Sequence, residues 1–168
     1  MKTLLILRHA KSSWDDPSQK DYDRPLNARG LKTAPLMGRL AVDKKLIPQT
    51  ILTSPAQRAV QTTELFTKAT KIKIKIQIID SFYPGNPSEH IKVLSLQDNQ
   101  HDKIMIVGHN PGLELLLEHL TNKPEPLPTC SLAVVHVPVK HWQDLISQST
   151  GKLVTVFRPK EIFKELHE

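Results

Sequence analysis

The sequence is poor in cysteine and has no long hydrophobic segment. Cys130 is the single cysteine, which excludes an intrachain disulfide, and we expect it to be a small buried apolar residue. The apolar stretch at the N-terminus ends at Arg8, too early for a secretory signal. No other run approaches the roughly 18 apolar residues that cross a bilayer. We therefore expect a cytoplasmic protein without a membrane partner.

Signatures of several other chemistries are also missing. There is no Gly-x4-Gly-Lys-Ser/Thr loop and no His-Glu-x-x-His motif. A cysteine phosphatase needs an arginine in a Cys-x5-Arg motif, and the sequence has His136 at that distance from Cys130. The remaining histidines show no spacing typical of metal ligands. We expect neither a metal nor another cofactor.

The net charge of +6 owes much to a cluster of lysines. From Lys71 to Ile76, lysine and isoleucine alternate, which is the period-two pattern of a strand with one solvent-exposed face. Lysines commonly protect edge strands. No aromatic residue interleaves with them to stack on bases. We interpret this segment as an edge strand and expect no nucleic-acid partner.

The order of the predicted elements indicates an α/β fold. The 168 residues suit one compact core, so we predict a single domain over residues 1–168. Short apolar strand candidates alternate with longer helical patterns, which favours a three-layer sandwich with a mostly parallel central sheet. The six strand candidates are Thr3–Leu7, Thr50–Thr53, Ile74–Ile79, Lys103–Val107, Leu132–Val137 and Leu153–Phe157.

Capping residues and prolines predict where the helices begin. Asn27 is expected to cap the first helix, and Ser54 to cap the second through a Ser-x-x-Gln capping box that ends at Gln57. A further helix is expected to start at Asn110, with a proline in its first turn, and a shorter one to run from Ser88 to about Leu96. The Pro-rich stretch 124–128 is interpreted as a surface connection.

Two arginines and two histidines follow three of the predicted strands. Arg8 and His9 end the first strand, Arg58 lies in the first turn of the helix after the second, and His109 follows the fourth. Ligands of open α/β sheets gather outside the carboxyl ends of the strands. Arginine forks match phosphate oxygens, and a neutral imidazole can attack phosphorus. The joint placement therefore points to phosphoryl transfer.

The segments around these residues resemble a known family. Leu7-Arg8-His9-Ala10, the stretch Ser54–Thr62 and Val107-Gly108-His109-Asn110-Pro111 are similar to the three signature segments of the histidine phosphatase superfamily, which includes phosphoglycerate mutases. The stretch Asp23–Gly30 and the short chain resemble its SixA-type phosphohistidine phosphatase branch. The resemblance implies a phosphoglycerate mutase-like fold.

The resemblance also implies roles for individual residues. His9 would accept the phosphoryl group, and Arg8, Arg58 and His109 would bind it. Arg24 would be a further substrate-binding residue, or else would form a salt bridge that fixes the loop before the first helix. The chain departs from mutase-like members at Asp15, where they have a phosphate-binding asparagine, so a mutase site is not expected.

The proton donor and the substrate stay open. The long insertion that carries an acidic residue in many relatives is missing, so Glu89, or else Asp80, is the candidate donor. A site without that insertion would be open to a phosphate carried by a protein. We expect a metal-independent phosphatase that acts on a phosphohistidine protein. The alternatives are a general small-molecule phosphomonoesterase acting on phosphate esters, and a non-catalytic phosphate-binding module.

Overall fold

The computed structural model describes residues 1–147 and 151–167, and in this part of the chain it contains one six-stranded sheet. The strand order is β3-β2-β4-β1-β5-β6. The first four strands in this order are parallel, while β5 and β6 add antiparallel pairs at one side. The expected mostly parallel sheet is confirmed. The strands are β1 (Lys2–Arg8), β2 (Thr50–Thr53), β3 (Lys75–Ile78), β4 (Lys103–Gly108), β5 (Leu132–Val137) and β6 (Lys152–Phe157).

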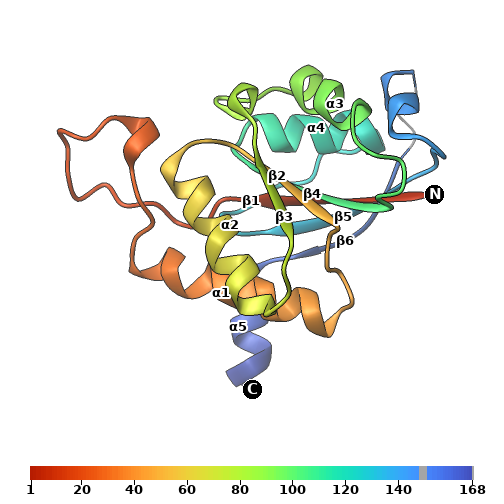
Figure 1. The fold of residues 1–168 in the computed structure, drawn as a ribbon. Coiled ribbons are helices and arrows are strands. Elements are labelled where there is room, and N and C mark those ends of the chain that lie inside the picture. Colours follow the sequence, from red (N-terminus) through yellow and green to blue (C-terminus); the bar gives the residue numbers. More distant parts are fainter. Residues whose placement is uncertain (148–150, 168) are drawn as a thin grey trace.

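Helices cover both faces of this sheet, which gives the expected three layers. Figure 1 shows α3 and α4 on one side and α1, α2 and α5 on the other. Three short 3-10 turns, η1, η2 and η3, lie in the connections. The helices are α1 (Ala28–Asp43), α2 (Gln57–Thr70), α3 (Pro87–Ser95), α4 (Gly112–Thr121) and α5 (Pro159–His167), and the turns are Asp21–Asp23, Asp80–Phe82 and Trp142–Ile146. None of the helices in these ranges is long and apolar enough to span a bilayer.

The central strand β1 is buried on both sides because helices cover both faces of the sheet. Leu4 and Ile6 pack into the cluster under α3 and α4, while Leu5 and Leu7 pack into the cluster under α1, α2 and α5. A strand enclosed in this way needs a continuous apolar run. Cys130 belongs to the second cluster, and burial raises the pKa of its thiol to about 12, so its predicted role as a buried apolar residue is confirmed.

The strand β3 lies at the edge of the sheet as predicted, but the expected buried isoleucine face is wrong. Ile72 and Ile76 are 46% and 40% exposed, although the alternation from Lys71 to Ile76 predicted their burial, and Ile74 is only partly buried against one apolar cluster. The physical reason is that β3 begins at Lys75, after most of this pattern, and that no residue of β3 belongs to either cluster, whereas Ile51 and Leu52 of β2 do. The period-two pattern identified an edge strand without revealing that the core stops one strand earlier.

Two predicted helix caps are wrong, while the Asn27 cap is confirmed. The Asn27 side chain accepts a hydrogen bond from the Gly30 amide at 3.0 Å. No capping box forms at Ser54, because α2 begins at Gln57 and the Ser54 hydroxyl is used by the Ala56 amide and by His109.

The Asn110 side chain likewise does not cap a helix. It donates hydrogen bonds to Glu114 and to the Leu127 carbonyl, and α4 begins at Gly112. The cap of α3 is Asn86, two residues before the predicted start at Ser88. The polar residues after β2 and β4 thus stabilise the loops at the sheet edge instead of the helix ends.

Candidate active site

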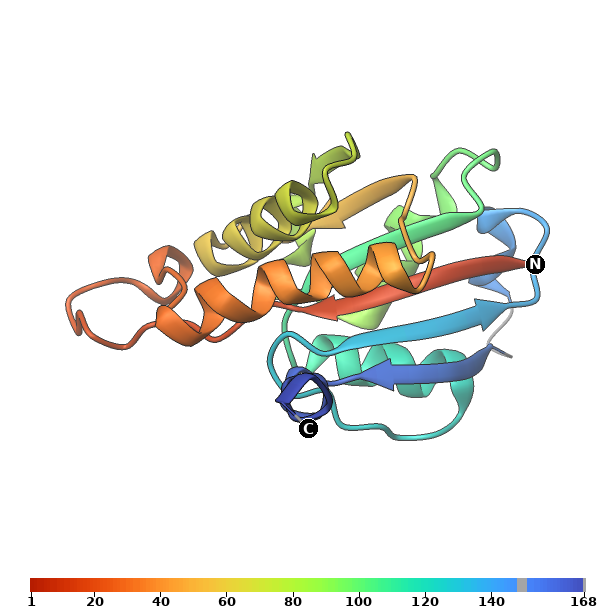
Figure 2. The same cartoon turned by 90° about the horizontal axis from the view of Figure 1, so that it is seen from below.

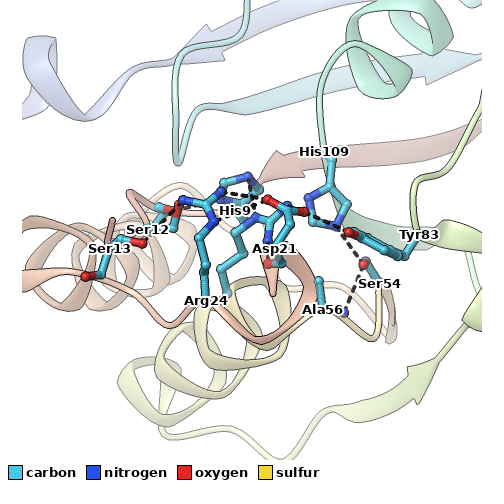
Figure 3. Close-up of polar contacts among 11 residues, drawn as sticks. His9, Ser12, Ser13, Asp21, Arg24, Ser54, Ala56, Tyr83 and His109 are labelled. Atoms are coloured by element: carbon cyan, nitrogen blue, oxygen red, sulfur yellow. Dashed lines mark hydrogen bonds and ion pairs between the residues drawn. The ribbon is translucent and has the colours of Figure 1, made fainter. Parts of the chain in front are cut away.

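The four predicted residues meet at the carboxyl ends of three adjacent strands. Arg8 is the last residue of β1 and His9 the next, His109 follows β4, and Arg58 is the second residue of α2. The ring centroids of His9 and His109 are 5.1 Å apart, and Arg58 Nε lies 3.4 Å from His9 Nε2. Figure 3 shows the two imidazoles side by side. The predicted gathering of these residues at one edge is therefore found.

The His9 ring is held in one tautomer. Its Nδ1 donates a hydrogen bond to the Ala10 carbonyl at 2.7 Å, which leaves the lone pair on Nε2 because a carbonyl oxygen can only accept. Burial lowers the pKa of His9 to about 3, against the opposing effect of the Ala10 carbonyl and with help from the charges of His109, Arg58 and Arg8. The Nε2 lone pair of this neutral imidazole accepts a hydrogen bond from Arg58 Nε at 3.4 Å.

The His109 ring has one engaged and one unpartnered nitrogen. Its Nε2 lies 2.7 Å from the Ser54 hydroxyl, whereas its buried Nδ1 has no hydrogen-bond partner. Burial, followed by the charge of Arg58, lowers the pKa of His109 to about 4. If the Ser54 hydroxyl donates to Nε2, the ring hydrogen is on Nδ1, where it can bind an oxyanion.

Arg8 is anchored at one end by the Pro-rich segment. Its Nη1 donates to the Leu127 carbonyl at 2.9 Å, and its buried Nε has no partner. The same carbonyl accepts a hydrogen bond from Asn110. The Pro-rich stretch 124–128 therefore does more than connect surface elements, because it positions a cation of the site. Its Leu127 is only 1% exposed.

A carboxylate that we did not predict lies within the site. Asp21 Oδ2 accepts hydrogen bonds from Arg58 Nη2 at 3.0 Å and from the Tyr83 hydroxyl at 2.7 Å. Asp21 Oδ1 accepts from Arg24 Nη2 at 3.0 Å and Nε at 3.2 Å. Figure 3 shows Asp21 between Arg24 and Tyr83, with His9 and His109 beside it.

These contacts control the charge of Asp21. Partial burial alone would raise the pKa of its carboxyl, but the hydrogen bonds from Tyr83 and Arg58, the charge of Arg58 and the hydrogen bond from Arg24 lower it to about 2. Asp21 is therefore ionised at neutral pH. A sequence signal was available, since Asp21 stands three residues before Arg24, which lies in the stretch Asp23–Gly30 that resembles the SixA-type branch.

Arg24 reaches the site only through Asp21. Besides its ion pair with Asp21, its Nη1 donates to the Ser12 hydroxyl at 3.0 Å, and its guanidinium carbon lies 3.4 Å from the centroid of the Trp14 ring. Arg24 is only 6% exposed, so these contacts hold it firmly. Its immediate effect is to stabilise the segment between β1 and α1, which extends beyond the carboxyl edge of the sheet in Figure 2.

The two predicted proton donors belong to α3 and η2 and not to the group of contacts around His9. Glu89 is in the first turn of α3, where Asn86 caps its amide, and Asp80 begins η2. Across residues 1–147 and 151–167, neither carboxylate forms a hydrogen bond or ion pair with Arg8, Arg58 or either site histidine.

The expected open pocket is not seen either, because His9, Arg58 and His109 are 6–7% exposed, with Asp21 and Tyr83 in contact with this group. In the part of the chain that the structure describes, no group of three or more His, Cys, Asp or Glu residues could hold a metal ion.

The fold and the site define a class: an α/β protein with two histidines and two arginines at the carboxyl edge of its sheet, suited to binding an oxyanion. The sequence profile of the histidine phosphatase superfamily (branch 1) matches residues 4–81. The crystal structure of a candidate SixA phosphohistidine phosphatase from Agrobacterium tumefaciens is 30% identical, with a TM-score of 0.80, and the match covers 94% of this chain and 98% of that one. The chain therefore belongs to the histidine phosphatase superfamily, and its branch is the SixA type.

Two further comparisons show how widely the sequence and the fold are shared. An uncharacterised chloroplastic protein of Arabidopsis thaliana is 31% identical over 157 residues, which are 88% of this chain and 72% of the plant protein. A structure of the protein histidine phosphatase SixA in complex with tungstate shares the fold at 21% identity and a TM-score of 0.81, over 95% of this chain and 99% of that one. Phosphatase activity is what membership of this family supports.

Proposed function

We propose that this protein removes phosphoryl groups through a covalent phosphohistidine on His9, with Arg8, Arg58 and His109 binding the phosphoryl oxygens. The observation that carries the proposal is the His9 ring, whose Nδ1 is bonded to the Ala10 carbonyl and whose Nε2 faces Arg58 Nε at 3.4 Å. This arrangement supplies a neutral nucleophile beside a fixed positive charge.

The reaction would proceed in two displacements. The Nε2 lone pair leaves its hydrogen bond to Arg58 Nε and bonds to phosphorus while the bond to the leaving atom breaks, and the leaving group keeps the electron pair and takes up a proton from solvent. Water then attacks phosphorus, the P–Nε2 bond returns its electrons to the ring, and phosphate is released with loss of a proton to solvent. Arg8 Nε and His109 Nδ1, buried and without partners, are free to donate to phosphoryl oxygens throughout.

Trapping of the intermediate tests the proposal. A phosphoramidate is stable to alkali and labile to acid, so rapid alkaline quenching with a labelled aryl phosphate should leave label on His9. The variant His9→Ala should retain no label and lose at least about 10³ in turnover. The variant His109→Ala should turn over slowly and still label. Label on His109, or no alkali-stable label in a single turnover, would contradict the role of His9, and retained phosphate binding without turnover would identify a non-catalytic module.

For the substrate we propose a phosphohistidine-bearing protein. The similarity to the Agrobacterium tumefaciens protein supports it, as does the chemistry, because an imidazole leaves phosphorus easily and needs little acid catalysis. A specific observation favours the alternative of small phosphate esters: His9, Arg58 and His109 are only 6–7% exposed, and Asp21 and Tyr83 contact this group. Comparison of kcat/KM for a phosphohistidine phosphotransfer protein with that for small phosphomonoesters decides between them.

A positively charged pocket supports the protein substrate. It has a volume of about 180 Å³ and lies between Lys11, the first turn of α1, the loop before β5 and the start of α5. Its charged lining residues are Lys11, Arg29, Arg158, Lys160 and one carboxylate, Glu161. Among the described residues, Arg158 is paired with Glu125, and no ion pair is formed by Lys11, Arg29 or Lys160. Such a pocket suits an acidic patch on a protein. The variant Lys160→Ala should raise KM for the phosphotransfer protein and leave KM for an aryl phosphate unchanged.

Our remaining proposals concern the setting of the reaction. We propose a single domain over residues 1–168, a cytoplasmic location, and turnover that needs no metal because Arg8 and Arg58 supply the positive charge that a metal would otherwise provide. Turnover should therefore persist in EDTA, and loss of turnover that a divalent ion restores would contradict this proposal.

A further inference from the structure

Asp21 occupies the donors that a phosphoryl group on His9 would need. Arg58 Nε is directed at His9 Nε2, while Nη1 donates to the Asp21 carbonyl at 2.6 Å and Nη2 to the Asp21 carboxylate at 3.0 Å. All three nitrogens of the guanidinium are therefore engaged, two of them by one residue. A phosphorus atom that approaches His9 Nε2 brings its oxygens to the same guanidinium, because Nε and Nε2 are only 3.4 Å apart. Asp21 and the phosphoryl group therefore compete for the Arg58 fork.

The structure also provides a position to which Asp21 can withdraw. Its second oxygen, Oδ1, is held by Arg24, and Arg24 is fixed independently by Ser12 and Trp14. Asp21 can therefore give up Arg58 and keep an ion pair. The side chain of Asp21 is 47% exposed and η1 contains no buried residue, so this movement does not disturb the core.

We propose that Asp21 is an internal competitor for the phosphoryl group and thereby determines the affinity of the site for phosphate. This inference rests on the proposed function of the same site. A ligand that binds only the form with a free Arg58 fork has its affinity reduced by the fraction of molecules in that form. The reduction applies to the substrate and also to inorganic phosphate, the product. Asp21 therefore weakens product binding and speeds phosphate release, and Arg24 is the residue that receives the displaced carboxylate.

Binding of inorganic phosphate and of tungstate, measured by calorimetry without turnover, tests this proposal. The variant Asp21→Asn removes the charge and keeps the size of the side chain, and we expect it to bind both anions about tenfold more tightly, the order of one charge-assisted hydrogen bond to the guanidinium. Asp23→Asn is the matched control, since Asp23 is an exposed carboxylate of the same 3-10 turn, η1. It makes the same change of charge and should leave both affinities within about twofold. In turnover, Asp21→Asn should show stronger product inhibition by phosphate.

The outcomes separate this proposal from the proposed function. If Asp21→Asn keeps the thermal stability of the wild type and binds phosphate equally or more weakly, Asp21 only positions Arg58 and the proposal is overturned. If His9 is labelled in the wild type while the affinity for phosphate is unchanged in Asp21→Asn, the proposed function stands and only this inference fails. If neither protein binds phosphate or tungstate and no label forms, both are overturned.

Discussion

Buried cations lie at both ends of the central sheet, and their surroundings differ. At the amino end, Lys2 is 3% exposed, and its ammonium donates to Asp102 at 2.9 Å and to the Asn99 carbonyl, with the Trp142 ring 5.8 Å away. At the carboxyl end, Arg58 is 6% exposed and also pairs with an accessible carboxylate, since the Asp21 side chain is 47% exposed and the Asp102 side chain 77%. Burial of a cation is therefore no sign of a site by itself.

Both ends contain a buried nitrogen without a partner, since His101 Nδ1 lacks one at the amino end, and what distinguishes the carboxyl end is that its unpartnered nitrogens belong to an arginine and a histidine beside His9. The buried nitrogens Arg8 Nε and His109 Nδ1 lack partners there, although buried polar groups are normally hydrogen-bonded. Lys2, in contrast, has two oxygen acceptors and an aromatic face. The amino end is thus organised for stability and the carboxyl end for binding, and the following predictions test this difference.

The largest effect is expected for Arg58→Lys. Lysine keeps the charge but loses the bidentate fork, so turnover should fall by about 10² to 10³, as when one preorganised donor is removed. Steady-state kinetics measures the fall, and thermal unfolding should show a folded protein. If the variant keeps near-normal activity, Arg58 does not bind the phosphoryl group.

Acidification should destabilise the protein mainly through the carboxyl end. The pKa values of His9, His90 and His109 are lowered by burial to about 3, 4 and 4. Between pH 6.5 and about 4, the unfolded chain therefore binds protons that the folded chain does not, and stability falls as the pH falls.

The expected loss is roughly 1 to 2 kcal/mol per histidine between pH 7 and pH 5. Urea unfolding at the two pH values measures it. His9→Ala should reduce the loss by about one third, because one of the three groups is removed. If the loss in the free energy of unfolding between the two pH values is the same in that variant as in the wild type, His9 titrates normally in the folded state.

At the amino end we expect the opposite result, because replacing Lys2 should change stability and leave catalysis unchanged. Lys2→Met keeps the aliphatic volume and removes the ammonium, so the Asn99 carbonyl and Asp102 lose a donor. We expect a loss of about 1 to 2 kcal/mol in the free energy of unfolding. The value of kcat/KM should stay within twofold of the wild type, and a larger fall would mean that the two ends are coupled.

The smallest effect is expected for Glu89→Gln. Its carboxylate has no hydrogen bond or ion pair to the four site residues, so kcat should change by less than about twofold with an aryl phosphate, whose leaving group needs no acid. The more sensitive test is the same comparison with an alkyl phosphate, whose alkoxide is a poor leaving group. A fall of tenfold or more there would restore Glu89 as the proton donor.

The layered fold and the place of the site follow from local features of the sequence. Apolar strands that alternate with amphipathic helices must be covered on both faces, and residues that follow adjacent parallel strands must share an edge. The sequence alone therefore predicts that four residues lie close together: Arg8, His9, Arg58 and His109. The Asn27 cap was equally predictable, because its acceptor bonds an amide three residues away.

Contacts between distant segments were not predictable in this way. Ser54 has the sequence of a capping box, yet His109, 55 residues away, bonds its hydroxyl at 2.7 Å. A local motif cannot reveal a competing partner that only the fold supplies.

Short-range patterns in the chain thus encode the strand ends, the residue types at the site and the family to which the chain belongs. The protonation state of His9 depends instead on burial and on neighbours that the fold supplies, as does the engagement of Arg58 by Asp21 from 37 residues away. The chemistry available to the chain is encoded locally, whereas the charges that control it arise from segments that meet only in the folded protein.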